Sequence, residues 1–314
     1  MAYRFGPDHP EETYVPHDFP ERTADLGEIA MNYAVAGADT APALLLVPGQ
    51  TESWWGFEAA MKLLADDFRV HAVDLRGQGR SSRTPGRYTL DNWGNDLVRF
   101  IQLIVKRPVI VAGLSSGGVL TAWLSAYAPP GLLRAAYYED PPLYSSEVRP
   151  ACGQSIRQSG IGGVFPLFTN YLGDQWSIGD WQGLIAAART ALPKERLAMM
   201  GFGDEPPQNL KEYDPEWARA FWTGTGTSGC DHDRMLKQVK VPVLFTHHFR
   251  HVDEASGMLQ GAASDLQVGR ARQLIEAAGQ PFVYCSFPQM GHAMHRIDPA
   301  LYAATLKEWA RTLR

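Results

Sequence analysis

The sequence feature that most constrains the fold is the stretch 109–118, Val-Ile-Val-Ala-Gly-Leu-Ser-Ser-Gly-Gly. An apolar run leads directly into Gly113-x-Ser115-x-Gly117, and a helix-compatible segment follows at 119–128. A serine on a tight strand-to-helix turn has a strained backbone, so the residues two before and two after it must be very small. The pattern therefore predicts a nucleophile elbow, with Ser115 as the candidate nucleophile for acyl chemistry.

Short apolar runs alternate with helix-compatible segments on both sides of this turn. The expected strands are a hairpin within 24–36 and the runs 43–47, 70–74, 108–114, 133–139, 241–246 and 281–286. The expected helices are 56–66, 90–105, the segment after the elbow, and a last one that Asp298-Pro299 begins. This alternation predicts an α/β protein whose mainly parallel sheet is covered by helices on both faces.

The alternation stops between residues 141 and 236, where glycine, proline and aromatic residues are frequent and strand signals are few. We expect this segment to be a helical cap inserted into a core formed by 21–140 and 237–314. Residues 1–20 are polar and rich in proline, which indicates an N-terminal arm.

The composition excludes several classes of protein. A chain of 314 residues can bury ~75% of its extended-chain surface, so a full core is expected. The net charge is −5 and there is no basic run, which argues against nucleic acid as a partner. No apolar run reaches the ~18 residues that a membrane span needs. The N-terminus has no apolar signal region, and the three cysteines form no CxxC pair, so we expect a cytoplasmic protein without disulfides or structural zinc.

A glycine-rich turn between a strand and a helix can also bind phosphate or a dinucleotide. A phosphate-binding loop needs Gly-Lys-Ser/Thr, and no lysine lies near Ser115. The GxGxxG spacing of dinucleotide-binding turns is absent as well. We therefore expect no cofactor. A homo-oligomer is compatible with the sequence.

The candidate general base is His292, which follows the last expected strand and has a glycine before it. That glycine lets the backbone turn the imidazole towards the serine. His295 competes for this role. His247, His248 and His251 also cluster, but no carboxylate or cysteine pattern completes a metal site, so we interpret them as a polar loop.

Two carboxylates are candidates for orienting the histidine. Glu139 ends the strand after the elbow helix, and Asp253 follows the strand at 241–246. Both agree with the chain order serine, acid, histidine. The residues themselves leave this choice open.

The oxyanion of an acyl-transfer reaction needs two backbone N–H groups. Ser116 supplies one at the start of the helix, and we expect Gln50, in the loop after the strand 43–47, to supply the other. Trp54, together with Trp181 and Trp217 of the cap, indicates a large, flat, apolar ligand.

These motifs together resemble the α/β-hydrolase superfamily: Pro48-Gly49 after a strand, the loop Asp74-Leu75-Arg76-Gly77-Gln78-Gly79-Arg80-Ser81, the elbow at Ser115 and the late His292. More narrowly, the chain is similar to the zearalenone lactonases. This narrower resemblance rests on the stretches 51–55, 175–181, 209–217 and 246–248.

The narrower resemblance implies that Glu139 is the triad acid and that Trp217 contacts the substrate. It also implies hydrolysis of a macrocyclic resorcylic lactone to an acid that can lose CO₂. The chain departs from the fungal members of that family at Leu114 and in the loop Pro48-Gly49-Gln50.

Other functions remain open on the same fold. A general carboxylesterase or a C–C hydrolase for hydrophobic aromatic substrates would use the same serine. A ligand receptor could keep the fold and bind without turnover. Epoxide hydrolases and haloalkane dehalogenases of this fold use an aspartate nucleophile, so Ser115 argues against them.

Overall fold

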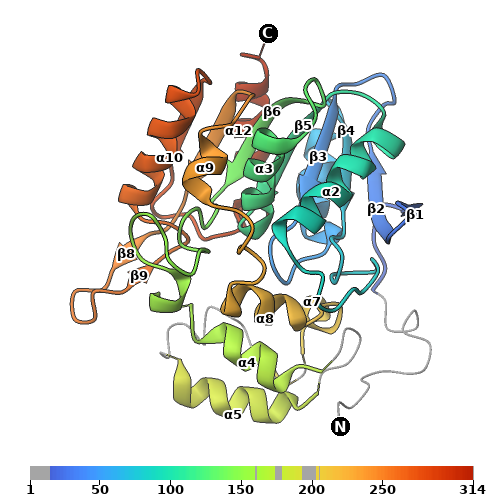
Figure 1. Cartoon of the computed structure of the whole chain (residues 1–314). Coiled ribbons are helices and arrows are strands. Elements are labelled where there is room, and N and C mark those ends of the chain that lie inside the picture. The colour runs from blue at the N-terminus through green and yellow to red at the C-terminus, as the bar shows by residue number, and fades with distance from the viewer. Residues whose placement is uncertain (1–14, 160, 174–178, 193–202, 205, 314) are drawn as a thin grey trace.

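The computed structural model describes residues 15–159, 161–173, 179–192, 203–204 and 206–313, and an eight-stranded sheet lies at its centre (Figure 1). The strand order is β1-β2-β4-β3-β5-β6-β7-β10. The strands are β1 (Glu21–Asp25), β2 (Ala30–Ala36), β3 (Ala43–Val47), β4 (Arg69–Val73), β5 (Val109–Leu114), β6 (Leu133–Glu139), β7 (Val243–His247) and β10 (Phe282–Ser286). β2 pairs antiparallel with β1 and β4, and the other pairs are parallel, which confirms the predicted mainly parallel sheet.

Helices cover both faces of this sheet, because the central strands are buried on both sides. Along β5, Val109 and Val111 belong to one hydrophobic cluster, whereas Ile110 and Ala112 belong to another. The first cluster includes side chains of α2 (Leu90–Phe100), α3 (Ser116–Tyr127), α9 (His232–Leu236) and α10 (Asp265–Ala277). The second includes side chains of η2 (Trp54–Phe57), α1 (Glu58–Leu64), α11 (Met294–Ile297) and α12 (Pro299–Ala310). Successive residues of one strand therefore hold two helical layers to the sheet.

Several helices begin where the sequence supplies a capping side chain. The Thr89 side chain accepts a hydrogen bond from the Asn92 amide, and Ser264 and Gln267 form a reciprocal capping box. Asp298 caps α12 with Pro299 at the first helical position, as predicted. Local sequence therefore sets where these helices start.

A helical insertion follows β6 and lies below the sheet in the view of Figure 1. Its helices are η4 (Ile156–Gln158), α4 (Val164–Tyr171), α5 (Trp181–Ala191), α7 (Gln208–Lys211) and α8 (Glu216–Thr223). α9, which also lies within 141–236, packs instead against α3 and α10 of the core. The cap boundaries therefore stay a prediction. Residues 1–14 of the predicted arm and 174–178 of the cap lie outside the described residues.

A short antiparallel hairpin of β8 (His251–Val252) and β9 (Leu259–Gln260) projects from the core next to α10 (Figure 1). In the described part of the chain, no helix has the length and apolar character that a membrane span requires.

Candidate active site

Ser115 lies on the sharp turn between β5 and α3. Its backbone has φ 55° and ψ −123°, in a region that residues with a side chain rarely adopt. A Cβ added to Gly113 would lie 2.3 Å from the Gly117 carbonyl oxygen, and one added to Gly117 would lie 2.4 Å from the Pro48 carbonyl oxygen. The glycines on either side are therefore required by close backbone packing, as the predicted elbow demands.

An imidazole and a carboxylate form a hydrogen-bonded pair at the same edge of the sheet. His292 Nδ1 lies 2.6 Å from Asp140 Oδ2, and the other Asp140 oxygen accepts the His248 amide at 3.0 Å. Asp140 directly follows β6, and the Ser115 amide donates to the Glu139 carbonyl at 2.9 Å. Ser115 and Asp140 thus follow the ends of two neighbouring parallel strands, and the two residues lie side by side.

Burial and charge act in opposite directions on this pair. Burial lowers the pKa of His292, but the hydrogen bond and the charge of Asp140 outweigh it, so the pKa is raised above its usual value. Burial raises the pKa of Asp140, yet the hydrogen bond and charge of His292 leave it below its usual value. With Nδ1 donating to the carboxylate, Nε2 is the basic nitrogen. The His292 side chain is 45% exposed, so that nitrogen can exchange protons with a substrate.

The predicted partner of His292, Glu139, contacts a different histidine. His295 Nδ1 lies 3.0 Å from Glu139 Oε2, and the His295 amide donates to Glu139 Oε1 at 3.0 Å. Side chains alternate along a strand, so Glu139 at the end of β6 turns towards α11, whereas Asp140 turns to the sheet edge. The predicted contact of Glu139 with His292 is corrected: His292 pairs with Asp140.

The alternative acid, Asp253, also lies away from the imidazole. It follows β8 in the projecting hairpin (Figure 1), where its Oδ1 accepts bonds from the amide and hydroxyl of Ser256. It therefore closes a local turn, and it forms no hydrogen bond or ion pair with His292.

The two predicted oxyanion donors flank the nucleophile. Among the described residues, neither the Ser116 amide nor the Gln50 amide donates a hydrogen bond to the protein. A Cβ on Gly49 would lie 3.2 Å from Ser115 Cβ, so the loop after β3 packs directly over the elbow. Both N–H groups are thus free to bind a developing negative charge.

A comparison with family models agrees with this geometry. Residues 44–305 match the model of the alpha/beta hydrolase family. The chain belongs to the alpha/beta hydrolase family.

Relatives of this hydrolase are distant. It is 31% identical over 109 residues to the 3-oxoadipate enol-lactonase 2 of Acinetobacter baylyi, an alignment that covers 34% of this chain and 40% of that protein. The alignment thus spans less than half the length of that curated relative.

Solved structures share the fold at lower identity. A putative aryl esterase from Burkholderia cenocepacia has a TM-score of 0.66 at 18% identity, covering 94% of this chain and 99% of that one. The enol-lactonase from Burkholderia xenovorans has a TM-score of 0.63 at 18% identity, covering 92% and 100% of the two chains.

The buried pair of Glu139 and His295 extends to the loop of the hydrolase that covers the elbow. His295 Nε2 lies 3.7 Å from Glu52 Oε2, and this oxygen accepts the Gly49 amide at 3.4 Å. Burial lowers the pKa of His295, but the charges of Glu139 and Glu52 raise it above its usual value. A protonated His295 between two carboxylates would hold the loop beside Ser115.

Two of the clustered histidines are engaged by the protein itself. The His248 ring bridges the His292 carbonyl at 2.9 Å and the Thr246 hydroxyl at 3.0 Å. His247 Nε2 lies 2.9 Å from the Ala263 carbonyl. Within the described residues, no three His, Cys, Asp or Glu side chains are grouped to bind a metal ion.

The tryptophans predicted to bind substrate are buried in the core. Trp54 donates to Glu21 at 2.6 Å, and Trp217 donates to the Arg76 carbonyl at 2.7 Å while packing on Trp93 at 3.8 Å between ring centroids. Trp181 is 4% exposed. The three indoles are enclosed by protein in this structure and present almost no surface, so their contact with a substrate stays a prediction.

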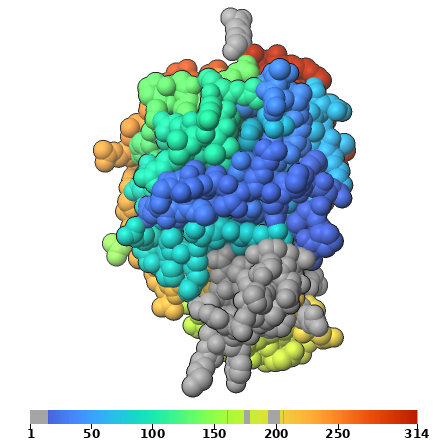
Figure 2. All heavy atoms as spheres, turned by 90° about the vertical axis from the view of Figure 1, so that its right-hand side faces the viewer, coloured from blue at the N-terminus to red at the C-terminus, as the bar shows by residue number. Residues whose placement is uncertain are grey.

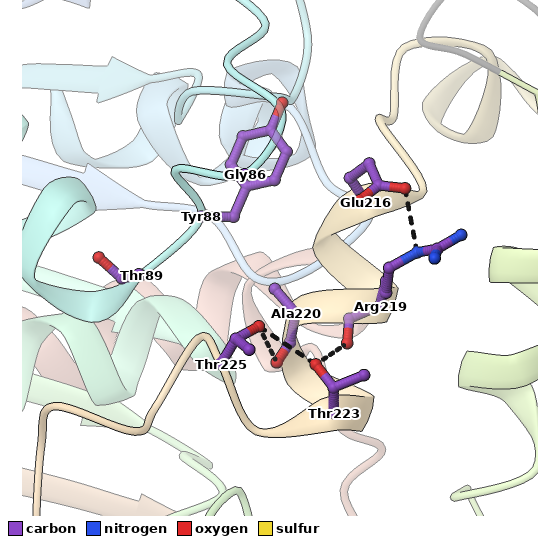
Figure 3. Close-up of a pocket in the computed structure, with 8 residues that line it drawn as sticks. All are labelled: Gly86, Tyr88, Thr89, Glu216, Arg219, Ala220, Thr223 and Thr225. Carbon is purple, nitrogen blue, oxygen red and sulfur yellow. Dashed lines mark hydrogen bonds and ion pairs between the residues drawn. The ribbon is translucent and has the colours of Figure 1, made fainter.

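A hollow of about 260 Å³ lies between α8 and the segment before α2 (Figure 3). Figure 3 shows Glu216 and Arg219 paired on one side, with Tyr88 opposite. Its lining includes none of Ser115, Asp140 and His292. It is therefore separate from the hydrolase site.

Proposed function

We propose that this hydrolase opens the ester bond of a macrocyclic lactone through an acyl-enzyme formed on Ser115. The observation that carries the proposal is the hydrogen-bonded Asp140–His292 pair at the sheet edge where the strained Ser115 turn ends. An orienting carboxylate, an imidazole and a serine are the parts that nucleophilic acyl transfer requires.

In the first step, His292 Nε2 takes the proton of the Ser115 hydroxyl as the oxygen attacks the lactone carbonyl. Asp140 holds the imidazole by Nδ1 and stabilises the imidazolium that forms. The amides of Gln50 and Ser116 donate to the oxyanion of the tetrahedral intermediate.

In the second step, the intermediate breaks its ring C–O bond and His292 returns the proton to the leaving oxygen. Because the substrate is a ring, the new hydroxyl stays attached to the acyl group on Ser115. A water molecule, deprotonated by His292, then attacks the ester and releases the ring-opened carboxylic acid. No redox partner is needed.

The lactone is supported by two independent likenesses. The sequence resembles the zearalenone lactonases, including in cap stretches, and a curated relative is named an enol-lactonase. We therefore propose zearalenone, a resorcylic macrolactone, as the substrate to test first. The physiological lactone can be a different molecule of the same class.

The test is incubation of the purified protein with zearalenone, with mass spectrometry of the products over time. We expect a product heavier by one water molecule, followed by its decarboxylated form, and no product from the Ser115→Ala variant. Turnover of p-nitrophenyl esters without turnover of zearalenone would instead support a general carboxylesterase. Tight zearalenone binding without any ester turnover would support a receptor.

A further inference from the structure

A second hollow, of about 470 Å³, lies at the opposite edge of the sheet from Ser115. Arg69 at the start of β4 and Lys106 and Arg107 just before β5 contribute to its lining. Ser115 follows the other end of β5, whose six residues separate the two sites by roughly 20 Å. Figure 2 shows this side of the molecule, where the N-terminal strands (blue) adjoin the segment that follows α2 (teal). The hollow is therefore distinct from the acyl-transfer site.

Positive charge dominates this hollow. Arg22, Arg69, Lys106 and Arg107 line it with Asp39 as the lone carboxylate, in a protein whose net charge is −5. A cluster of cations on an acidic protein creates a local field that attracts anions.

Two of these cations are fixed and two are available. Arg69 donates to Asp39 Oδ1 at 2.7 Å, and Arg107 donates to the Asp39 carbonyl at 2.7 Å. Among the described residues, the side chains of Arg22 and Lys106 have no ion pair or hydrogen bond. The pocket thus has an ordered wall and two uncompensated charges.

The backbone around Lys106 is held in a defined conformation. The π-helical turn η3 (Ile101–Val105) ends at Lys106, whose amide donates to the Ile101 carbonyl at 2.7 Å and whose φ is 59°. Left-handed geometry at a lysine is costly, and π-helical turns occur frequently at functional sites. This turn fixes the position of the Lys106 backbone at the hollow.

His71 is the buried polar side chain of the hollow. It is 6% exposed, it lines the cavity, and its Nδ1 has no hydrogen-bond partner among the described residues. Burial, with the charge of Arg69, lowers its pKa to about 4, so the imidazole is neutral near pH 7. The unpartnered Nδ1 offers one hydrogen bond to a ligand or to a water that the ligand orders.

We propose that this hollow binds a small organic phosphate monoester. Arg22 and Lys106 contact the phosphate, and the organic body lies against the aliphatic side chains of Leu103 and Ile104. A pocket of this size accommodates a small organic ligand, and guanidinium groups suit the geometry of phosphate oxygens. The inference is independent of the reaction at Ser115.

The test is isothermal titration of the whole protein at low ionic strength with phenyl phosphate, inorganic phosphate and phenol. We expect phenyl phosphate to bind about tenfold more tightly than inorganic phosphate, and phenol to bind least, because both charge and apolar body are used. Arg22→Gln and Lys106→Gln should each weaken phenyl phosphate about tenfold. The matched control Arg134→Gln, an exposed arginine of β6, should bind as the wild type does.

Two further measurements test whether phenyl phosphate binds in this hollow and not at Ser115. Ester hydrolysis by Arg22→Gln and Lys106→Gln should equal that of the wild type, which shows that they fold. Phenyl phosphate should bind the Ser115→Ala variant unchanged, since the two sites are on opposite edges. Equal binding of phenyl phosphate and inorganic phosphate, wild-type binding by both variants, or binding lost in Ser115→Ala would each overturn the proposal.

Discussion

Two acid–histidine pairs lie next to each other in this hydrolase, and they differ mainly in exposure. Asp140 with His292 and Glu139 with His295 have similar hydrogen bonds, at 2.6 and 3.0 Å. The His292 side chain is 45% exposed, whereas His295 is 0% exposed and stacks on Phe57 at 4.0 Å. Two carboxylate–imidazole pairs of the same kind can therefore serve different purposes: an accessible imidazole can move protons, and an enclosed one can hold structure.

The largest effect is expected from removing the charge beside the accessible imidazole. Asp140→Asn should lower kcat by about 10⁴-fold, because the amide no longer stabilises the imidazolium or fixes its tautomer. Esterase kinetics and thermal unfolding measure this, and the melting temperature should change little compared with kcat. Asp253→Asn is the matched control and should retain wild-type kinetics. If Glu139→Gln abolishes turnover while Asp140→Asn does not, the assignment of the two pairs is reversed.

Glu139→Gln should act on stability more than on catalysis. It leaves His295 buried without its main carboxylate, and breaking a buried ion pair costs about 3–5 kcal/mol. Urea unfolding measures the loss, and kcat should fall by less than about tenfold, through looser packing of the Glu52 loop on Ser115.

The pH dependence of that stability loss sharpens the same prediction. The pKa of His295 is raised in the folded state, so its stabilisation is present below the unfolded pKa and is lost as pH rises through the folded pKa. The difference between wild type and Glu139→Gln should therefore be largest in mildly acidic buffer. A difference that grows with pH would contradict a protonated His295.

The pH profile of activity tests the accessible pair. Turnover needs neutral His292, and Asp140 raises its pKa, so kcat/KM should rise with pH through a value above 6.5. Asp140→Asn removes the largest influences that raise the pKa of His292, while burial still lowers it and Glu52 and Glu139 still raise it, so the pKa falls and the residual activity should rise at lower pH. An unchanged profile in that variant would show that Asp140 does not set the charge of His292.

The sheet and the elbow could be predicted from the sequence because their signals are local. A strained serine between two required glycines is recognisable in five residues, and apolar runs mark strands buried on both faces. The acid could not be chosen in the same way. Glu139 and Asp140 are adjacent, and their contacts differ only through the alternation of β6 and the left-handed backbone of Asp140 (φ 41°).

The sequence nevertheless carries a signal for the contact between Asp140 and His292. Glu139 ends β6 and Asp140 follows it directly, and two histidines, His292 and His295, stand three residues apart after β10. Two pairs were therefore available, and pairing both acids with both histidines would have brought Asp140 into consideration. The substrate contacts of the tryptophans stay a prediction, because an aromatic-rich cap can fill its own core as readily as line a cavity.

The smallest effect is expected at Trp217, a buried side chain that, like His295, is enclosed by protein. Trp217→Phe removes the bond to the Arg76 carbonyl, but this oxygen keeps a contact from Trp93 at 3.4 Å. Stability should therefore fall by about 1 kcal/mol, and KM should stay within about twofold, because the indole packs on α2 and not on the ligand. Trp222→Phe, at a half-buried indole over which Arg157 lies at 5.9 Å, is the matched control and should change less. A KM raised about tenfold in Trp217→Phe would mean that the cap opens far enough for this ring to reach the substrate.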